Sequence, residues 1–176
     1  MHPRKIVVIG PESTGKSTLS IQLAQALSTV YNPEYAREYL DKIGRPYTEE
    51  DLQAIARGQI AEEDRLAQEA NEVLVCDTDL QVIKVWSEAR FGQCHPQILE
   101  WIASRRYDLY LLTFPDIPWQ PDPQREHPDP ADRMRFYQQY RDIVEQSGVP
   151  WVDIRGSEEA RLALAVQAVH AQLPGE

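Results

Sequence analysis

The sequence predicts an α/β fold in which helices cover both faces of a parallel sheet. Short apolar runs alternate with helical patterns along the 176 residues, and this alternation is typical of βαβ units. The first apolar run leads directly into residues 10–17, which read GPESTGKS. That segment matches the phosphate-binding P-loop, G-x-x-x-x-G-K-[ST]. A chain of this length is expected to form one domain, over residues 1–176.

Five apolar segments are predicted to be strands: 5–9, a weak one at 30–33, 73–77, 108–113 and 151–154. The first is a β-branched run of the kind that forms a fully buried strand. Helical periodicity follows the P-loop, with Leu19, Leu23 and Leu27 on one face. A second helix is predicted from Thr48 to about residue 70, with Asp51 in a capping-box position. Further helices are expected at about 80–91, 96–105, 131–147 and 157–172.

The P-loop predicts a nucleotide site, because strand, glycine-rich turn and helix follow one another in the required order. Its glycines let the backbone approach a phosphate, and consecutive N–H groups form an anion nest at the helix N-terminus. Lys16 can reach the β- and γ-phosphates of ATP, and the Ser17 hydroxyl can bind Mg²⁺. The predicted nucleotide contacts are Gly10, Glu12, Ser13, Thr14, Gly15, Lys16, Ser17 and Thr18.

The composition restricts the class of protein. A net charge of −10 and a pI of about 4.9 argue against nucleic acid as a partner, because non-specific binding needs a basic face. Two cysteines, Cys76 and Cys94, imply no disulfide framework, and Cys76 ends an apolar run that is expected in the core. No signal peptide or membrane span is predicted, so a cytoplasmic protein is expected. The composition does not decide between a monomer and a homo-oligomer.

Two carboxylates lie at the end of the third predicted strand, in the order Asp77-Thr78-Asp79. Ligands of parallel α/β sheets bind at the carboxyl ends of the strands, and P-loop enzymes hold the magnesium shell at such an acid. Asp77 is therefore predicted to hold the Mg²⁺ ion or its water shell, together with Ser17. Asp79 is a candidate substrate contact. In the alternative interpretation, either aspartate caps the helix that follows.

Residues 32–39 read NPEYAREY and follow the weak second strand. In a small-molecule kinase the acceptor hydroxyl lies here, beside the P-loop. Glu34 can take its proton and Arg37 can offset phosphate charge. The alternative is a solvated helix in which Arg37 pairs with Asp41 at i, i+4.

A proline-rich stretch at about 114–130 is predicted to be a lid. Six of the 13 prolines lie between residues 115 and 130, which excludes helix or sheet, and a loop of this length is often a lid. Arg125 can bring positive charge to a transferring phosphoryl group. A mobile linker with surface arginines is the alternative. Trp119 and Tyr35 are candidate substrate contacts, since aromatic faces can bind a cationic ring, although aromatics at such spacings also fit a core.

These segments together resemble the ribosylnicotinamide kinase domain of the bacterial NadR-like family, within the P-loop NTPase superfamily. The resemblance rests on GPESTGKSTL at 10–19, EYAREYL at 34–40, IARGQ at 55–59, CDTDL at 76–80 and PW at 118–119. It implies a P-loop kinase fold with strand order 2-3-1-4-5. It also implies Mg²⁺-dependent transfer of the γ-phosphoryl group of ATP to the 5′-hydroxyl of nicotinamide riboside. In the lid, where the family pattern D-G-x-R is expected, residues 119–125 read WQPDPQR and lack the glycine.

The same residues are also compatible with other functions. One is a kinase for another nucleoside or a small alcohol, and another is an ATPase or GTP-binding module of the same family without an acceptor. A GTPase switch is disfavoured because the chain has no N-K-x-D motif, and the D-x-x-G match at 41–44 does not follow a strand.

Overall fold

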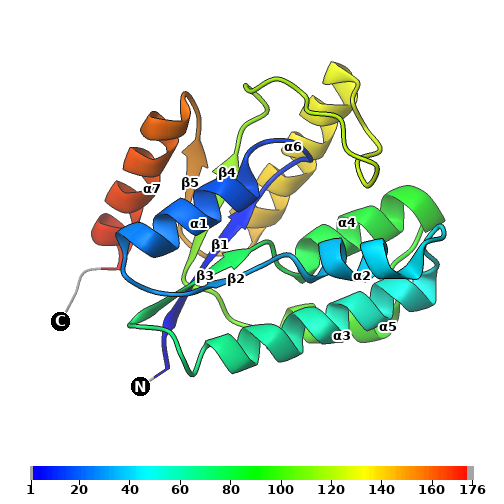
Figure 1. Cartoon of the computed structure of the whole chain (residues 1–176), viewed down its shortest axis with the longest axis horizontal. Coiled ribbons are helices and arrows are strands. Elements are labelled where there is room, and N and C mark those ends of the chain that lie inside the picture. The colour runs from blue at the N-terminus through cyan, green and yellow to red at the C-terminus, as the bar shows by residue number, and fades with distance from the viewer. Residues whose placement is uncertain (1, 174–176) are drawn as a thin grey trace.

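Five parallel strands form one sheet in the computed structural model, which describes residues 2–173 (Figure 1). The strands are β1 (Arg4–Ile9), β2 (Tyr31–Asn32), β3 (Val73–Asp77), β4 (Leu109–Thr113) and β5 (Trp151–Ile154). Their order is β2-β3-β1-β4-β5, and every neighbouring pair is parallel. The predicted fold class and strand order are confirmed.

Seven helices occur among the described residues, and they connect the strands. They are α1 (Lys16–Ala26), α2 (Tyr35–Ile43), α3 (Glu49–Leu66), α4 (Leu80–Phe91), α5 (Pro96–Ser104), α6 (Pro130–Gln146) and α7 (Glu158–Gln172). The predicted cap of α3 is confirmed. The Thr48 side chain accepts from the Asp51 backbone N–H, and the Asp51 carboxylate accepts from the Thr48 backbone N–H.

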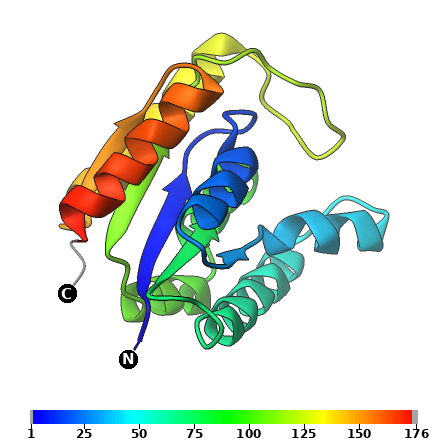
Figure 2. The ribbon, with the colours of Figure 1, turned by 60° about the vertical axis from the view of Figure 1, so that its left-hand side comes forward.

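The sheet is buried between two helical layers, because successive residues of a strand point to opposite faces. Ile6 and Val8 of β1 pack with α1 and α7 on one face. Val7 and Ile9 pack with α4 and α6 on the other. Figure 2 shows α1 and α7 against the same side of the sheet. Cys76 is fully buried in the second cluster, as its apolar context predicts.

A third apolar cluster lies between α2, α3, α4 and α5, beside the sheet. Leu52, Ile55 and Ala56 of α3 form its centre. This helical group fixes α2 next to the carboxyl ends of β2 and β3. Residues 114–129 contain neither helix nor strand, and in both views they rise above the edge of the sheet where the P-loop lies.

Three details differ from the sequence prediction. The second strand is only two residues long. The helix α3 ends at Leu66 rather than near residue 70, because residues 67–69 form a turn. The segment after Glu34 is a helix, as the alternative interpretation held, but Arg37 does not pair with Asp41. Its guanidinium binds Asp122 of the proline-rich loop instead, at 2.7 Å.

Candidate functional site

The P-loop joins β1 to α1 through tight backbone packing. A Cβ atom at Gly10 would lie 2.3 Å from Thr113 Oγ1 and 2.8 Å from the Thr113 carbonyl oxygen, so only glycine fits between the ends of β1 and β4. Thr14 Oγ1 lies 2.6 Å from Thr113 Oγ1 and donates to the Pro11 carbonyl at 2.7 Å. The Ser13 backbone has a φ of 57°, an uncommon left-handed conformation for serine. The loop is therefore fixed against the end of β4.

Two buried arginines bind carbonyl groups of the P-loop backbone. Arg133 of α6 donates to the Ser13 carbonyl at 3.0 Å, and Arg161 of α7 donates to the Thr14 carbonyl at 2.5 Å. These hydrogen bonds fix two peptide units of the loop, and consecutive N–H groups in such a loop are the kind of nest that binds anions. The sequence reasoning assigned no role to Arg161. A signal existed, since Arg161 lies on the same helical face as the buried Ala165 and Ala168.

The first two residues of α1, Lys16 and Ser17, lie close to Asp77 at the end of β3. Lys16 Nζ donates to the Pro11 carbonyl at 2.7 Å. Burial lowers the pKa of Lys16, and the nearby carboxylates of Glu34 and Asp77 oppose that shift. The Ser17 hydroxyl donates to Asp77 Oδ2 at 2.5 Å, whereas the buried Asp77 Oδ1 has no hydrogen-bond partner.

This donor set fits a magnesium ion. A hydroxyl and a carboxylate are hard oxygen ligands, and Mg²⁺ is commonly bound by one or two protein oxygens together with water and phosphate oxygens. Across residues 2–173, no group of three or more histidine, cysteine, aspartate or glutamate side chains is suited to hold a metal by itself. Ser17 at the start of α1 and Asp77 at the end of β3 place two such oxygen donors side by side next to the loop.

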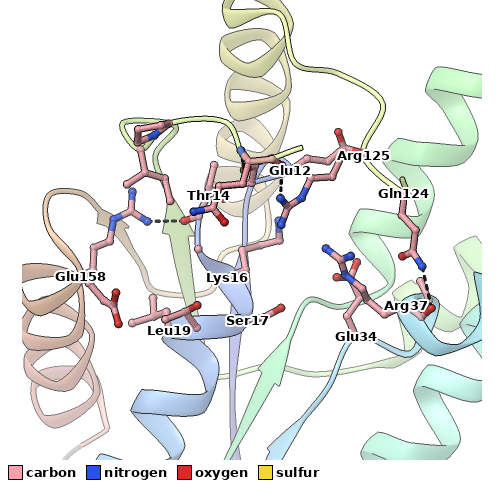
Figure 3. Close-up of a pocket in the computed structure, with 18 of the residues that line it drawn as sticks. Glu12, Thr14, Lys16, Ser17, Leu19, Glu34, Arg37, Gln124, Arg125 and Glu158 are labelled. Atoms are coloured by element: carbon pink, nitrogen blue, oxygen red, sulfur yellow. Dashed lines mark hydrogen bonds between the residues drawn. The ribbon is translucent and has the colours of Figure 1, made fainter. Parts of the chain in front are cut away.

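A cavity of about 440 Å³ opens over the P-loop. Figure 3 shows Glu158 and Leu19 on one side of Lys16, and Glu34 and Arg37 on the other. The cavity thus has two ends, one between α1 and α7 and one beside α2. The predicted site residues that line it are Glu12, Ser13, Thr14, Gly15, Lys16, Ser17, Thr18, Glu34, Arg37 and Arg125.

Glu34 contributes a carboxylate that is not used for capping. It is the N-cap residue of α2, yet its side chain makes no cap hydrogen bond, and it lines the cavity instead. Burial raises the pKa of Glu34 to about 7, and the negative charge of Asp77 adds to the shift, whereas Lys16 and Arg37 oppose it. A carboxylate with such a pKa can accept a proton at neutral pH.

The proline-rich loop is fixed to the P-loop and to α2. The Glu12 carboxylate accepts from the backbone N–H groups of Glu126 and His127, both at 3.1 Å. Gln124 Nε2 donates to the Arg37 carbonyl at 3.1 Å and to Asp41 Oδ1 at 2.5 Å. The loop therefore lies over the cavity, whose lining includes Ile117, Pro118, Gln120, Gln124 and Arg125.

The missing glycine of the lid pattern does not prevent a tight turn. Arg125 N donates to the Asp122 carbonyl at 3.0 Å, and Gln124 N donates to Asp122 Oδ1 at 2.9 Å. Pro123 occupies the second position of this turn, where proline is favoured. The Asp122 and Arg125 positions keep the D-x-x-R spacing, and Arg125 lines the cavity.

Three predicted substrate contacts do not line the main cavity. The Tyr35 ring packs against Gly58 of α3, and Trp119 lies beside the Arg133 guanidinium, 5.7 Å from its ring centroid. Asp79 caps α4, as the alternative interpretation held. Its Oδ1 accepts from Gln81 N at 3.0 Å, and its Oδ2 accepts from the Tyr110 hydroxyl at 2.8 Å.

Trp86 is an aromatic side chain at the α2 end that the sequence reasoning missed. It lies on α4 and lines the main cavity. Its position within an apolar helical pattern gave no sign of a role, since the same pattern serves the core. In a separate observation, none of the helices that the structure describes is long and apolar enough to cross a membrane.

Known proteins resemble this chain over nearly its whole length. The AAA domain family AAA_28 matches residues 5–161. The trifunctional NAD biosynthesis/regulator protein NadR of Escherichia coli (strain K12) is 28% identical over 177 residues, which cover 97% of this chain and 43% of that protein. The NadR of Salmonella typhimurium is 27% identical over 173 residues, which cover 94% of this chain and 42% of that protein. The chain thus spans less than half the length of these curated relatives.

Solved structures show the same fold. A NadR protein in complex with NAD and AMP-PNP superimposes with a TM-score of 0.81 at 24% identity, covering 99% of this chain and 51% of that one. A NadR protein in complex with NR gives a TM-score of 0.79 at 24% identity, covering 99% of this chain and 52% of that one. The chain therefore belongs to the AAA domain family AAA_28 and has a NadR-like P-loop kinase fold.

Proposed function

We propose that this protein is an ATP- and Mg²⁺-dependent kinase that phosphorylates the 5′-hydroxyl of nicotinamide riboside and forms nicotinamide mononucleotide. The observation that carries the proposal is the juxtaposition of the P-loop with the Glu34 carboxylate in one cavity of about 440 Å³. A phosphate site alone fits any nucleotide-binding module. A carboxylate with a pKa near 7 on the other side of Lys16 also provides a base for an acceptor hydroxyl.

The two ends of the cavity suit the two substrates. The triphosphate of ATP would lie on the P-loop N–H groups and Lys16, with its nucleoside toward α1 and α7. The acceptor would lie at the α2 end, with its hydroxyl between Glu34 and the γ-phosphoryl group. Ser17 and Asp77 would hold Mg²⁺, which neutralises charge on the β- and γ-phosphates.

The transfer then needs few protein groups. The 5′-oxygen forms a bond to the γ-phosphorus while the bond to the bridging β–γ oxygen breaks and ADP leaves. The hydroxyl proton passes to Glu34. Lys16, Arg37 and Arg125 stabilise the negative charge on the transferring group, and the loop at 114–129 keeps water from the site. Arg37 must exchange its ion pair with Asp122 for a phosphate contact.

Two comparisons support the choice of nicotinamide riboside. The curated relatives are NAD biosynthesis/regulator proteins, and one of the similar solved structures is a NadR protein in complex with NR. The small-molecule acceptor and ATP are accordingly the proposed partners.

The proposal is tested by incubating the purified protein with ATP, Mg²⁺ and nicotinamide riboside. Mass spectrometry is expected to show nicotinamide mononucleotide in an amount equal to the ADP that is released. The same ADP-release assay, run over a panel of nucleosides, ranks the acceptors. ADP release without a phosphorylated riboside would refute the substrate, and a higher rate with another nucleoside would replace it.

A further inference from the structure

Two adjacent residues of α3, Gly58 and Gln59, hold the first residue of α2. The Tyr35 ring packs against Gly58. Gln59 is buried, and its Oε1 accepts from the Tyr35 backbone N–H at 2.8 Å. The end of the IARGQ segment at 55–59 therefore binds both the side chain and the backbone of Tyr35.

The hydrogen bond from Gln59 provides an acceptor that α2 does not provide for itself. The first N–H groups of a helix have no partner within that helix, and an N-cap side chain usually accepts from one of them. Glu34 is the N-cap residue of α2, but its side chain makes no such bond. Because Gln59 of a neighbouring helix binds the first N–H, the Glu34 carboxylate is left to line the cavity (Figure 3).

The same hydrogen bond fixes the direction of the Glu34 side chain. The Tyr35 N–H belongs to the planar peptide that joins Glu34 to Tyr35, so its direction relative to the Glu34 side chain depends on the Glu34 ψ angle, which is 104°. On the other side, the Pro33 ring fixes its own φ angle, and Asn32 pairs with Cys76 of β3. With both neighbours held, a change in that ψ angle would turn the carboxylate away from its place in the cavity.

The charges around Glu34 give this restraint a purpose. The carboxylates of Asp77 and Glu12 repel the Glu34 carboxylate. The cations Lys16 and Arg37 attract it. A carboxylate that was free to turn would be drawn toward either cation rather than toward a neutral hydroxyl group. A base for an acceptor hydroxyl therefore needs a backbone that holds its direction.

We propose that Gln59 is a positioning residue for phosphoryl transfer, which holds the peptide after Glu34 so that the Glu34 carboxylate faces the acceptor hydroxyl. This inference rests on the proposed function and adds to it a residue that does not contact the reacting atoms, since Gln59 is not among the residues that line the main cavity. Gln59 Nε2 has no hydrogen-bond partner within residues 2–173. The side-chain oxygen is thus the part of the amide that this role uses.

Gln59→Met tests the role, because it removes the acceptor oxygen at a similar side-chain volume. Displacement of a catalytic group by about 1 Å can cost about 100-fold in rate, so kcat with nicotinamide riboside is expected to fall by about tenfold or more. The KM for ATP is expected to stay within about twofold, because the P-loop is unchanged. Gln53→Met is the matched control. It makes the same change on the same helix, where the Gln53 side chain has no hydrogen bond to a described residue, and it is expected to keep the wild-type kcat.

Two further variants separate positioning from a general loss of packing. Gln59→Glu keeps an oxygen at the same place, and burial favours the neutral form of its carboxyl group, so kcat is expected to stay within about threefold of the wild-type value. Gln59→Asn is one methylene shorter and is expected to behave like Gln59→Met. Circular dichroism identifies a variant that fails to fold, and if Gln59→Met does so, Gln59→Asn and Gln59→Glu decide.

Amide hydrogen exchange provides a measurement that does not depend on turnover. The Tyr35 N–H is expected to exchange about tenfold faster in Gln59→Met than in Gln53→Met, because its acceptor is gone. An unchanged exchange rate would show that Gln59 does not hold this peptide, and would overturn the proposal.

The kinetic outcomes separate the two levels of the proposal. If the wild-type protein phosphorylates no riboside, the proposed function fails and the role of Gln59 fails with it. If the wild-type protein is active and Gln59→Met keeps its kcat, the kinase stands and the positioning role is refuted. A higher KM for the riboside at unchanged kcat would refute it as well, because it would assign Gln59 to acceptor binding. The same holds if Gln59→Glu loses as much kcat as Gln59→Met.

Discussion

Gly58 of α3 sits directly against the Tyr35 ring of α2, and its replacement by alanine sets two effects against each other. Alanine favours a helix interior over glycine by about 1 kcal/mol. A Cβ atom at this position, however, would lie 2.2 Å from Tyr35 Cε1 and 2.3 Å from Tyr35 Cζ. No carbon–carbon contact persists at that distance, so either the ring or the whole of α2 must move.

The steric effect is expected to win. Adding a methyl group to a well-packed region costs about 1–3 kcal/mol, and Tyr35 is poorly able to yield because its backbone N–H donates to Gln59 Oε1 at 2.8 Å. The difference between these two effects is a net destabilisation, so Gly58→Ala is expected to lower the free energy of unfolding by up to about 2 kcal/mol. In a Tyr35→Ala background the clash is gone, and the same change is expected to raise it by about 1 kcal/mol.

Urea unfolding followed by circular dichroism measures the four free energies of this double-mutant cycle. Ala61→Gly, at an exposed position of the same helix, calibrates the intrinsic effect of glycine in α3. A stabilising Gly58→Ala with equal size in both backgrounds would refute the reasoning. Because Tyr35 follows Glu34 directly, the single variant is also expected to reduce phosphoryl transfer more than ATP binding.

Three further predictions concern single side chains. Lys16→Ala is expected to remove nearly all phosphoryl transfer while circular dichroism shows an intact fold, and wild-type activity would disprove the P-loop assignment. Because the pKa of Glu34 is about 7, kcat/KM is expected to rise with pH through about 7; Glu34→Gln should flatten this profile and lower kcat by about 100-fold or more. Burial is the main reason that the pKa of Asp79 is raised from 3.8 to about 7. Between these two pH values, Asp79 is protonated in the folded state and ionised in the unfolded state. The free energy of unfolding should therefore fall as pH rises from about 4 to 7, by at most about 1.4 kcal/mol per pH unit. Urea unfolding of Asp79→Asn should show a weaker fall over the same range. A fall as steep as that of the wild-type protein would contradict the raised pKa of Asp79.

Most of the fold could be predicted from local sequence patterns. The P-loop with its flanking strand and helix is specified by residues next to one another in the chain, as is the cap formed by Thr48 and Asp51. The alternation of apolar runs with helical patterns then predicted a parallel sheet. The weak second strand was predicted in place but was too long, because only Tyr31 and Asn32 pair with β3.

The candidate site was harder to predict where its contacts join distant segments. Asp41 lies four residues from Arg37 and is a natural local partner, yet Asp122, 85 residues away in the chain, takes the guanidinium. Likewise, Arg161 reaches the P-loop from the last helix. The helical and strand periodicity of a sequence does not indicate which residues from distant segments bind one another. The aromatic residues were also hard to assign, because only tertiary structure separates Tyr35, which packs on α3, from Trp86, which lines the main cavity.

The hydrogen bonds of the proline-rich loop have a thermodynamic consequence. Its backbone binds Glu12 of the P-loop, and its Gln124 side chain binds α2. A ligand at either end of the cavity that favours this closed position stabilises the same closed state for the other. By reciprocity, each substrate must then raise the affinity for its partner by the same factor. Binding measured with both substrates present is therefore expected to be synergistic.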